Sequence, residues 1–135
     1  MIRKQKNIVY WGLRLIASAI MLQTLFFKFS GAPESIYIFS TLGVEPWGRI
    51  VTGLLELVAS ILILIPATTA FGSLLGVGLM VGAIFSHLTI LGIVVQDDHG
   101  QLFLYACLVF TSCLILLYVH KWQLPFIKSK RSHNE

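Results

Sequence analysis

This sequence is short of charge. Only 12% of its residues are Asp, Glu, Lys or Arg, against about 25% in an average soluble domain. Residues 57–96 contain none of the four. One bilayer crossing needs about 20 residues. This stretch is too long for one crossing, so it must contain a turn between two crossings. This shortage of charge excludes an ordinary soluble protein. The net charge of +4 comes from the two ends of the chain, and it gives no reason to expect nucleic acid as a partner.

Cysteine is scarce as well. Cys107 and Cys113 are the only two, and a six-residue spacing on one helix separates them by about 9 Å along the axis. A disulfide needs Cα atoms roughly 4.4–6.8 Å apart, so we expect two free cysteines that pack as small apolar groups. The sequence also lacks zinc-binding spacings, phosphate loops and nucleotide fingerprints, and it predicts no metal site.

Apolar residues make up 56% of the chain, and they fall into four runs of membrane-spanning length. The spans are expected at about 8–27, 48–65, 70–94 and 101–119, in a single domain covering residues 1–135. The predicted fold class is an all-α membrane protein, a four-transmembrane-helix bundle. A cleaved signal peptide ending near Ala17-Ser18-Ala19 is the alternative for the first run. Arg14 interrupts that run and apolar residues continue through Phe27, so a retained helix is favoured.

The distribution of charge predicts the orientation. Lys and Arg gather at both ends of the chain, and Asp97 and Asp98 lie in an opposite turn. By the positive-inside rule both termini are cytoplasmic, as is the basic tail 120–135, with Trp122 as an interfacial anchor. In the first outer loop, Pro33, an acid in the next position and Gly43 are typical of a short helix. We expect that helix to lie in the outer interface.

Two ionisable residues lie within the apolar spans. Glu56 and His87 are each expected about 12 Å below the outer face, at 1.5 Å per residue, on adjacent antiparallel helices. Such groups usually face the bundle interior and mark functional sites, although an acid–histidine pair that only fixes helix register is the alternative. We take Glu56 and His87 as candidate catalytic residues. The candidate ligand-binding residues around them are Gln23, Lys28, Trp47, Arg49 and Ser86.

Two further features each leave two interpretations open. Arg14 lies about 9 Å from the cytoplasmic face, where it could extend to the headgroups or close a second, cytoplasmic-side pocket. Small residues repeat at four-residue spacing in the third span, which indicates close helix packing inside the bundle or contact with a second copy in a homodimer. The repeats are Gly72 with Gly76, and Gly78 with Gly82.

Several stretches together resemble the DoxX family of small bacterial membrane proteins, over about residues 8–120. The first span contains Arg14-Leu15 and is followed by Phe27-Lys28-Phe29. The later matches are Glu45-Pro46-Trp47-Gly48-Arg49, Gly53-Leu54-Leu55-Glu56 and Gly82-Ala83-Ile84-Phe85-Ser86-His87-Leu88. The resemblance implies a four-helix protein of the bacterial inner membrane. DoxD-like relatives serve as the membrane subunit of a thiosulfate:quinone oxidoreductase, so the resemblance favours a redox function.

Two functional hypotheses follow. In the first, the chain is the membrane subunit of a quinone-linked oxidoreductase complex. Glu56 and His87 would then bind the quinone and exchange its proton, Lys28 and Arg49 would attract an anionic donor, and a redox partner protein would supply electrons. In the second, the chain is a non-enzymatic scaffold or small-molecule carrier, and Glu56–His87 is a structural pair. Proton-coupled transport is a weaker third hypothesis, because four helices without an inverted repeat make a small transporter.

Overall fold

The computed structural model describes residues 2–132, with side chains for residues 2–128, and the described part is helical without strands. Four helical stretches within it are long and apolar enough to cross a membrane: Ile2–Phe29, Trp47–Leu64, Pro66–Leu91 and Gln101–Gln123. This confirms the all-α, four-transmembrane-helix fold. The α-helices are α1 (Ile2–Phe29), α2 (Pro33–Thr41), α3 (Trp47–Leu64), α4 (Thr69–Ser86), α5 (Gln101–His120) and α6 (Pro125–Ser132).

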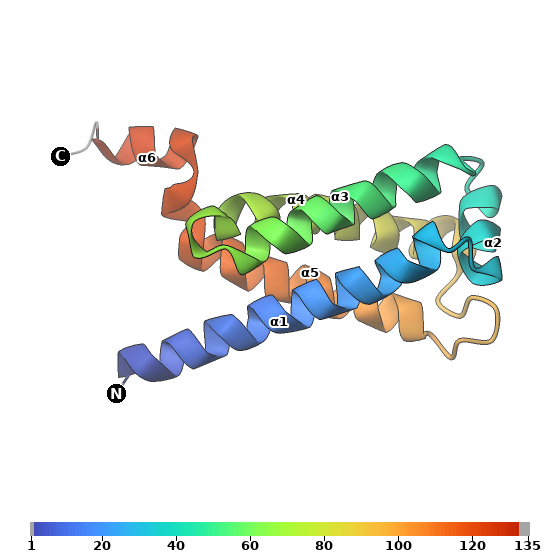
Figure 1. Cartoon of the computed structure of the whole chain (residues 1–135), viewed down its shortest axis with the longest axis horizontal. Coiled ribbons are helices and arrows are strands. Elements are labelled where there is room, and N and C mark those ends of the chain that lie inside the picture. Colours follow the sequence, from blue (N-terminus) through green and yellow to red (C-terminus); the bar gives the residue numbers. More distant parts are fainter. Residues whose placement is uncertain (1, 133–135) are drawn as a thin grey trace.

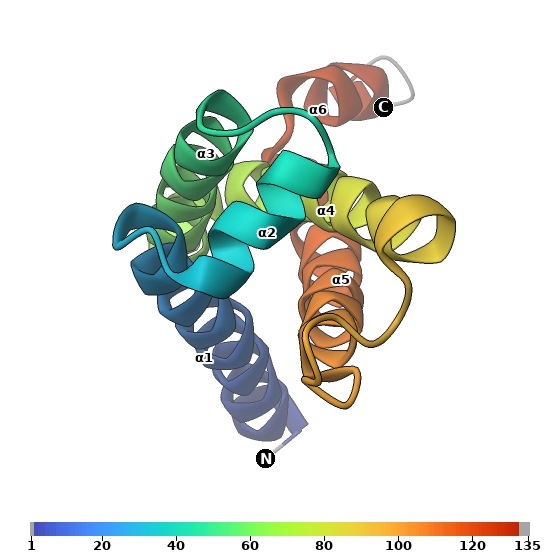
Figure 2. The same ribbon diagram turned by 90° about the vertical axis from the view of Figure 1, so that its right-hand side faces the viewer.

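The four long helices form one antiparallel bundle (Figure 1). Contacts join α1 to α3, α3 to α4, α4 to α5 and α5 back to α1, so the helices close a ring. The short α2 lies across one end of this ring (Figure 2), and α6 and the start of α1 lie at the other. We call these the α2 end and the terminal end.

The α2 helix forms where the sequence predicts a short helix. Pro33 is its first residue, where a missing N–H is harmless, and Glu34 lies in its first turn. The chain leaves the helix through Gly43, whose φ of +76° suits a residue without a Cβ.

Pro66 follows the end of α3 at Leu64, close to the predicted end of the second span at residue 65. The tight α3–α4 turn satisfies its own carbonyl groups. This matters because unpaired backbone groups are costly in a bilayer. The Thr68 hydroxyl lies 2.9 Å from the Leu62 carbonyl oxygen, and the Thr69 hydroxyl lies 3.1 Å from that of Ile65. Gln123 adds a contact from the far end of the chain, because its amide donates to the Pro66 carbonyl at 2.8 Å and accepts from the Ala70 N–H at 2.9 Å.

That contact shows that the start of the expected basic tail 120–135 packs against the bundle. A 3-10 turn, Lys121–Gln123, carries Gln123 to the α3–α4 turn, and α6 follows it. Hydropathy cannot detect a glutamine that recognises a distant turn. Residues 133–135 of the predicted tail lie outside the described residues.

Arg14 does not extend to the bundle surface, as the first of its two interpretations, an extension to the headgroups, would require. It is 5% exposed, and its Nη2 lies 3.0 Å from Nε2 of His120. Its guanidinium lies 4.7 Å from the centroid of the Trp11 ring. Nδ1 of His120 lies 2.9 Å from the Leu116 carbonyl oxygen. Since that carbonyl can only accept, Nδ1 carries a proton and Nε2 accepts from Arg14.

The third span begins and ends earlier in the sequence than the predicted 70–94, at Pro66 and Leu91. A π-helical turn, His87–Leu91, follows α4, and Gly92 ends it with a φ of +79°, a conformation that cannot continue a right-handed helix. Residues 92–94 are apolar but belong to the loop, which is why composition alone placed them in the span.

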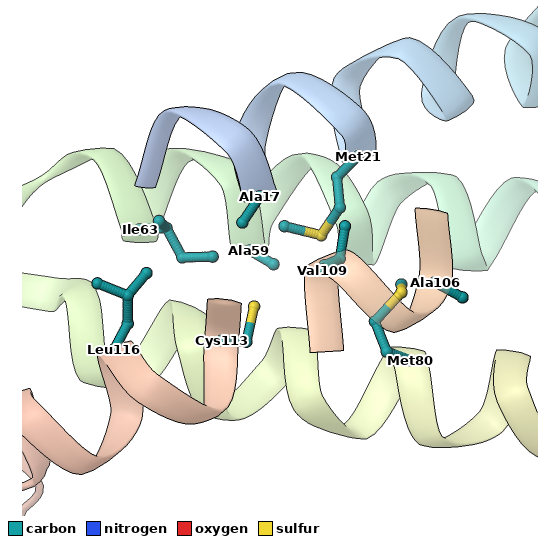
Figure 3. Close-up of a cluster of buried hydrophobic side chains, with 9 residues drawn as sticks. All are labelled: Ala17, Met21, Ala59, Ile63, Met80, Ala106, Val109, Cys113 and Leu116. Atoms are coloured by element: carbon teal, nitrogen blue, oxygen red, sulfur yellow. The ribbon is translucent and has the colours of Figure 1, made fainter. Parts of the chain in front are cut away.

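Buried apolar side chains from all four long helices meet in one hydrophobic core (Figure 3). Gly72 lets α4 approach α3 closely, since a Cβ there would lie 2.6 Å from the Ile63 nitrogen and 2.8 Å from the Ala59 oxygen. Gly76 does the same for α5, because a Cβ would lie 2.7 Å from Sγ of Cys113. This first glycine pair therefore packs inside the bundle. The buried core residues are Ala17, Met21, Ala59, Ile63, Met80, Ala106, Val109, Cys113 and Leu116.

Gly72→Ala should destabilise the fold by about 1–3 kcal/mol, because the added methyl overpacks against α3 backbone that cannot rotate away. Gly78→Ala is the matched control: its Cβ meets nothing within 4 Å, and alanine favours a helix by about 1 kcal/mol. Denaturant unfolding in detergent micelles measures both. Equal stability of the two variants would contradict this account of the packing.

Candidate functional site

A cavity of about 720 Å³ occupies the α2 end of the bundle, within the roughly 300–1,000 Å³ typical of small-molecule sites. All four long helices line it, together with α2 and the α4–α5 loop. Its lining includes core residues of α1, α4 and α5, which form an apolar floor. These floor residues are Met21, Met80, Ala106 and Val109.

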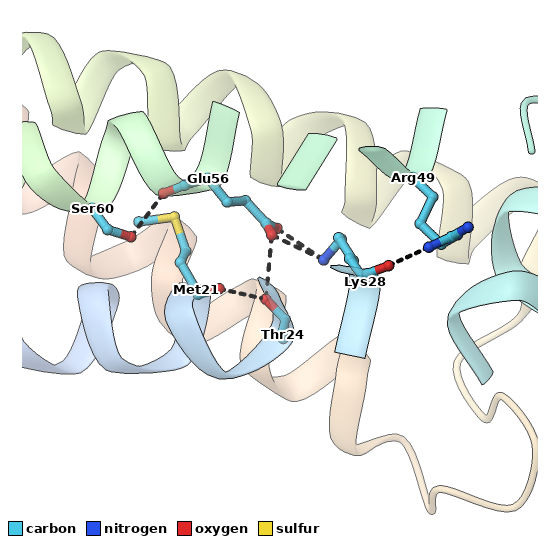
Figure 4. Close-up of polar contacts among 6 residues, drawn as sticks. All are labelled: Met21, Thr24, Lys28, Arg49, Glu56 and Ser60. Carbon is cyan, nitrogen blue, oxygen red and sulfur yellow. Dashed lines mark hydrogen bonds and ion pairs between the residues drawn. The ribbon is translucent and has the colours of Figure 1, made fainter. Parts of the chain in front are cut away.

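A buried ion pair joins α1 and α3 at the cavity wall (Figure 4). Nζ of Lys28 lies 3.0 Å from Oε2 of Glu56 and 3.1 Å from Oε1. Glu56 is 4% exposed and both side chains line the cavity. A carboxylate at the centre of a membrane helix costs about 2.5–3.5 kcal/mol, so the lysine compensates a charge that the apolar surroundings disfavour.

Thr24 is a third member of this polar cluster. Its hydroxyl lies 3.4 Å from Oε2 of Glu56 and 3.0 Å from the Met21 carbonyl oxygen, and its single proton can serve one of these acceptors at a time. Thr24 and Lys28 are four residues apart and share one face of α1. That spacing is a sequence signal which could have identified Thr24.

Arg49 holds the end of α1 in place from outside the cavity lining. Its Nε lies 2.9 Å from Oε1 of Glu45, and its Nη1 donates to the Lys28 carbonyl oxygen. It therefore caps the last turn of α1, where free carbonyl groups favour a cation. Trp47 is 77% exposed and also lies outside the lining. The other predicted site residues line the cavity: Gln23, Lys28, Glu56, Ser86 and His87.

His87 lines the same cavity but does not pair with Glu56. It is 6% exposed, and its Nδ1 lies 2.8 Å from the Gly92 carbonyl oxygen. The π turn brings this carbonyl within reach of the ring, and such turns are frequent at functional sites. The ring also makes an edge contact with Phe103, with centroids 5.6 Å apart. Depth along the helices placed both residues at one level, but it could not show that Lys28 on α1 is the nearer partner of Glu56.

Asp98 organises the loop at the cavity mouth. Its Oδ1 accepts hydrogen bonds from the N–H groups of Val95 and Gly100, both at 2.9 Å, and its Oδ2 accepts from Leu102 at 3.1 Å. Burial raises the pKa of Asp98, but these backbone donors outweigh that effect, and the pKa lies below its usual value. The carboxylate thereby holds the loop against the first turn of α5.

The second glycine pair of α4 leaves space instead of closing it. Gly78 and Gly82 both line the cavity, and a Cβ built on either would meet nothing within 4 Å. Sequence spacing alone does not distinguish them from Gly72 and Gly76. No group of three or more His, Cys, Asp and Glu residues is placed to hold a metal ion within residues 2–132.

Lys28→Met should cost about 3–5 kcal/mol of stability, because it leaves a buried carboxylate without its partner. The double variant Lys28→Met/Glu56→Met should recover most of that loss, since apolar residues often replace a buried pair without penalty. Unfolding free energies of the two variants and the wild type in micelles test this. A double variant as unstable as Lys28→Met would contradict the pairing.

Asp98 should make stability depend on pH. Because its folded-state pKa is depressed, the carboxylate stabilises the fold above its unfolded value of about 3.9, and that contribution is lost as the pH falls through the folded pKa. Asp98→Asn should therefore be less stable than wild type at about pH 7 and lose less on acidification to about pH 3. Thermal unfolding at both pH values measures this, and parallel losses in the two proteins would contradict it.

Comparison with known proteins places the chain in a family. No curated protein and no solved structure matches it. The model of the DoxX-like family matches residues 13–116, a range that contains the core, the cluster of Thr24, Lys28 and Glu56, and His87. The chain is a member of the DoxX-like family of membrane proteins.

Proposed function

We propose that this protein is a redox-associated membrane subunit that binds a quinone, or a similar small amphipathic molecule, in the cavity at the α2 end. The observation that carries the proposal is the combination of an apolar floor with a polar wall in one cavity of about 720 Å³. Sites for such ligands are mostly apolar, with a few placed polar groups that fix orientation. A ring and its tail fit the floor, and the oxygens face the polar wall.

In this proposal Glu56 and His87 contact the polar group of the ligand and exchange the proton that accompanies its reduction. Lys28 holds Glu56 in place from α1, and Arg49 positions Lys28 through its carbonyl group. Gln23 and Ser86 line the cavity and help orient the ligand. Trp47 lies at the start of α3, outside the lining, and carries no contact with the ligand here.

The anionic electron donor expected from the sequence is not part of the proposal. Lys28 already pairs with Glu56, and Arg49 pairs with Glu45, so neither cation is free to attract an anion. In this proposal the chain has no redox cofactor of its own, so a redox partner protein would supply the electrons. With both termini in the cytoplasm by the positive-inside rule, the α2 end faces outward across the bacterial inner membrane.

A second candidate function is a non-enzymatic scaffold or carrier. The engagement of Glu56 by both Lys28 and Thr24 favours it, since such a cluster stabilises helix packing with or without chemistry. Glu56→Gln separates the two functions. A folded variant that binds quinone but no longer supports quinone-dependent electron transfer in membranes favours the redox function. A loss of stability with unchanged transfer in the surviving protein favours the scaffold.

Filling the cavity tests the binding. Gly82→Leu should fold normally, because its Cβ meets nothing within 4 Å and leucine is a good helix former, but the side chain takes up space that the ligand needs. Binding of a decyl-chain benzoquinone, followed by calorimetry or by thermal shift in micelles, should weaken by at least about tenfold, or about 1.4 kcal/mol.

Gly12→Leu is the matched control. Its Cβ also meets nothing within 4 Å, and Gly12 lies on α1 outside the cavity lining. It should bind quinone as the wild type does. Wild-type protein that neither binds the added quinone nor carries quinone in its lipid extract would refute the proposed function.

A further inference from the structure

The cavity carries the opposite charge to the rest of the protein. Among the residues with described side chains, four of the six acidic residues of the sequence line it, namely Glu34, Glu56, Asp97 and Asp98, but Lys28 is the sole lysine or arginine there. One lysine against four acids leaves a formal charge of −3 when His87 is neutral, in a chain of net charge +4. Because Lys28 pairs with Glu56, the uncompensated negative charge is that of Glu34, Asp97 and Asp98 at the cavity mouth. A negatively charged head group would meet repulsion there.

Two hydroxyl groups of the wall have no proton free for a ligand, whereas the Tyr105 hydroxyl accepts from Gln101 at 2.6 Å and keeps its own. The Ser86 hydroxyl donates to the Gly82 carbonyl at 2.8 Å, and Thr24 has acceptors in both Glu56 and Met21. The oxygens of these hydroxyls keep their lone pairs, but their protons are already in use. Gln23 and Gln96 offer both donors and acceptors. Lys28 is already paired with Glu56. The other charged groups of the lining are carboxylates, which only accept hydrogen bonds.

His87 supplies the most specific group. Its Nδ1 lies 2.8 Å from the Gly92 carbonyl, and a carbonyl cannot donate, so Nδ1 carries the proton in the neutral ring and Nε2 is an acceptor. Nε2 has no hydrogen-bond partner among the described residues, although the side chain is 6% exposed and lines the cavity. Nε2 is not among the fully buried atoms that lack a partner, so it is accessible, and a ligand that donates a hydrogen bond can bind it.

We infer that the ligand bears a neutral or cationic head group that donates hydrogen bonds, a hydroxyl or an amine, with one donor at His87 Nε2. For a quinone pair, this selects the reduced hydroquinone, whose hydroxyl groups donate, over the oxidised quinone, whose carbonyl groups only accept. The inference rests on the proposed function and specifies the form of ligand that the cavity holds.

Three probes of one shape test the donor. They are a decyl-chain hydroquinone, the matching quinone and the dimethyl ether of the hydroquinone, each titrated calorimetrically into the full-length protein in micelles at about pH 8, where an ordinary histidine is neutral. The hydroquinone should bind about tenfold more tightly than the other two, as expected for an acceptor that loses its donor. His87→Leu should abolish the preference. Replacement of the exposed loop residue His99 by Asn should leave it intact.

A carboxylate-bearing hydroquinone with the same tail tests the charge. It should bind about tenfold more weakly than its neutral parent at low salt, and the double variant Glu34→Gln/Asp97→Asn should reduce that difference. Asn suits position 97, where φ is +60°. Gln5→Lys/Asn7→Lys, which adds the same two charges at the terminal end, should leave the difference unchanged.

The outcomes separate the two claims. Quinone or ether binding as tightly as hydroquinone, or the carboxylate binding as tightly as its parent, overturns the inference, while loss of that binding in Gly82→Leu keeps the proposed function standing. Binding of none of the probes overturns the proposed function and the inference with it.

Discussion

Glu56 is held inside the bundle by a lysine from another helix, and the arrangement of the α2 end depends on that contact. The two carboxylate oxygens lie 3.0 and 3.1 Å from one ammonium nitrogen, which fixes α1 and α3 in one register at this level. Arg49 extends the same connection by bonding the Lys28 carbonyl and the Glu45 carboxylate. Four charged groups, Lys28, Glu56, Arg49 and Glu45, thus position one another at the α1–α3 side of the cavity.

The opposite side is set by glycine and by one irregular turn. Gly72 and Gly76 draw α4 against α3 and α5 towards the terminal end, where the core is dense. Further along the same helix, a Cβ built on Gly78 or Gly82 would meet nothing within 4 Å, so these glycines leave space. The π turn then directs Nδ1 of His87 to the Gly92 carbonyl. The α4 helix therefore packs closely against its neighbours at Gly72 and Gly76 and leaves space at Gly78 and Gly82. This difference places the cavity next to the packed core.

The fold was largely predictable because hydropathy and charge report directly on bilayer crossing. The four spans, the Pro66 turn and the short helix beginning at Pro33 all follow from local signals. The site was less accessible. Equal depth placed Glu56 and His87 at one level, but depth says nothing about rotation of the helices, so it missed the pairing with Lys28. The contacts of Gln123 and Arg14 were not predicted because their partners are 53 and 106 residues away, and no local pattern encodes such contacts.

Mapping the position of a bound quinone tests the central claim most directly. A hydroquinone with a photoreactive tail, irradiated in membranes and followed by peptide mass spectrometry, should label residues of α1, α4 and α5 that line the cavity, such as Met21, Met80 and Val109. An excess of unlabelled hydroquinone should suppress that labelling. Labelling confined to lipid-facing residues such as Val51 and Leu54 of α3, unaffected by competitor, would contradict the account.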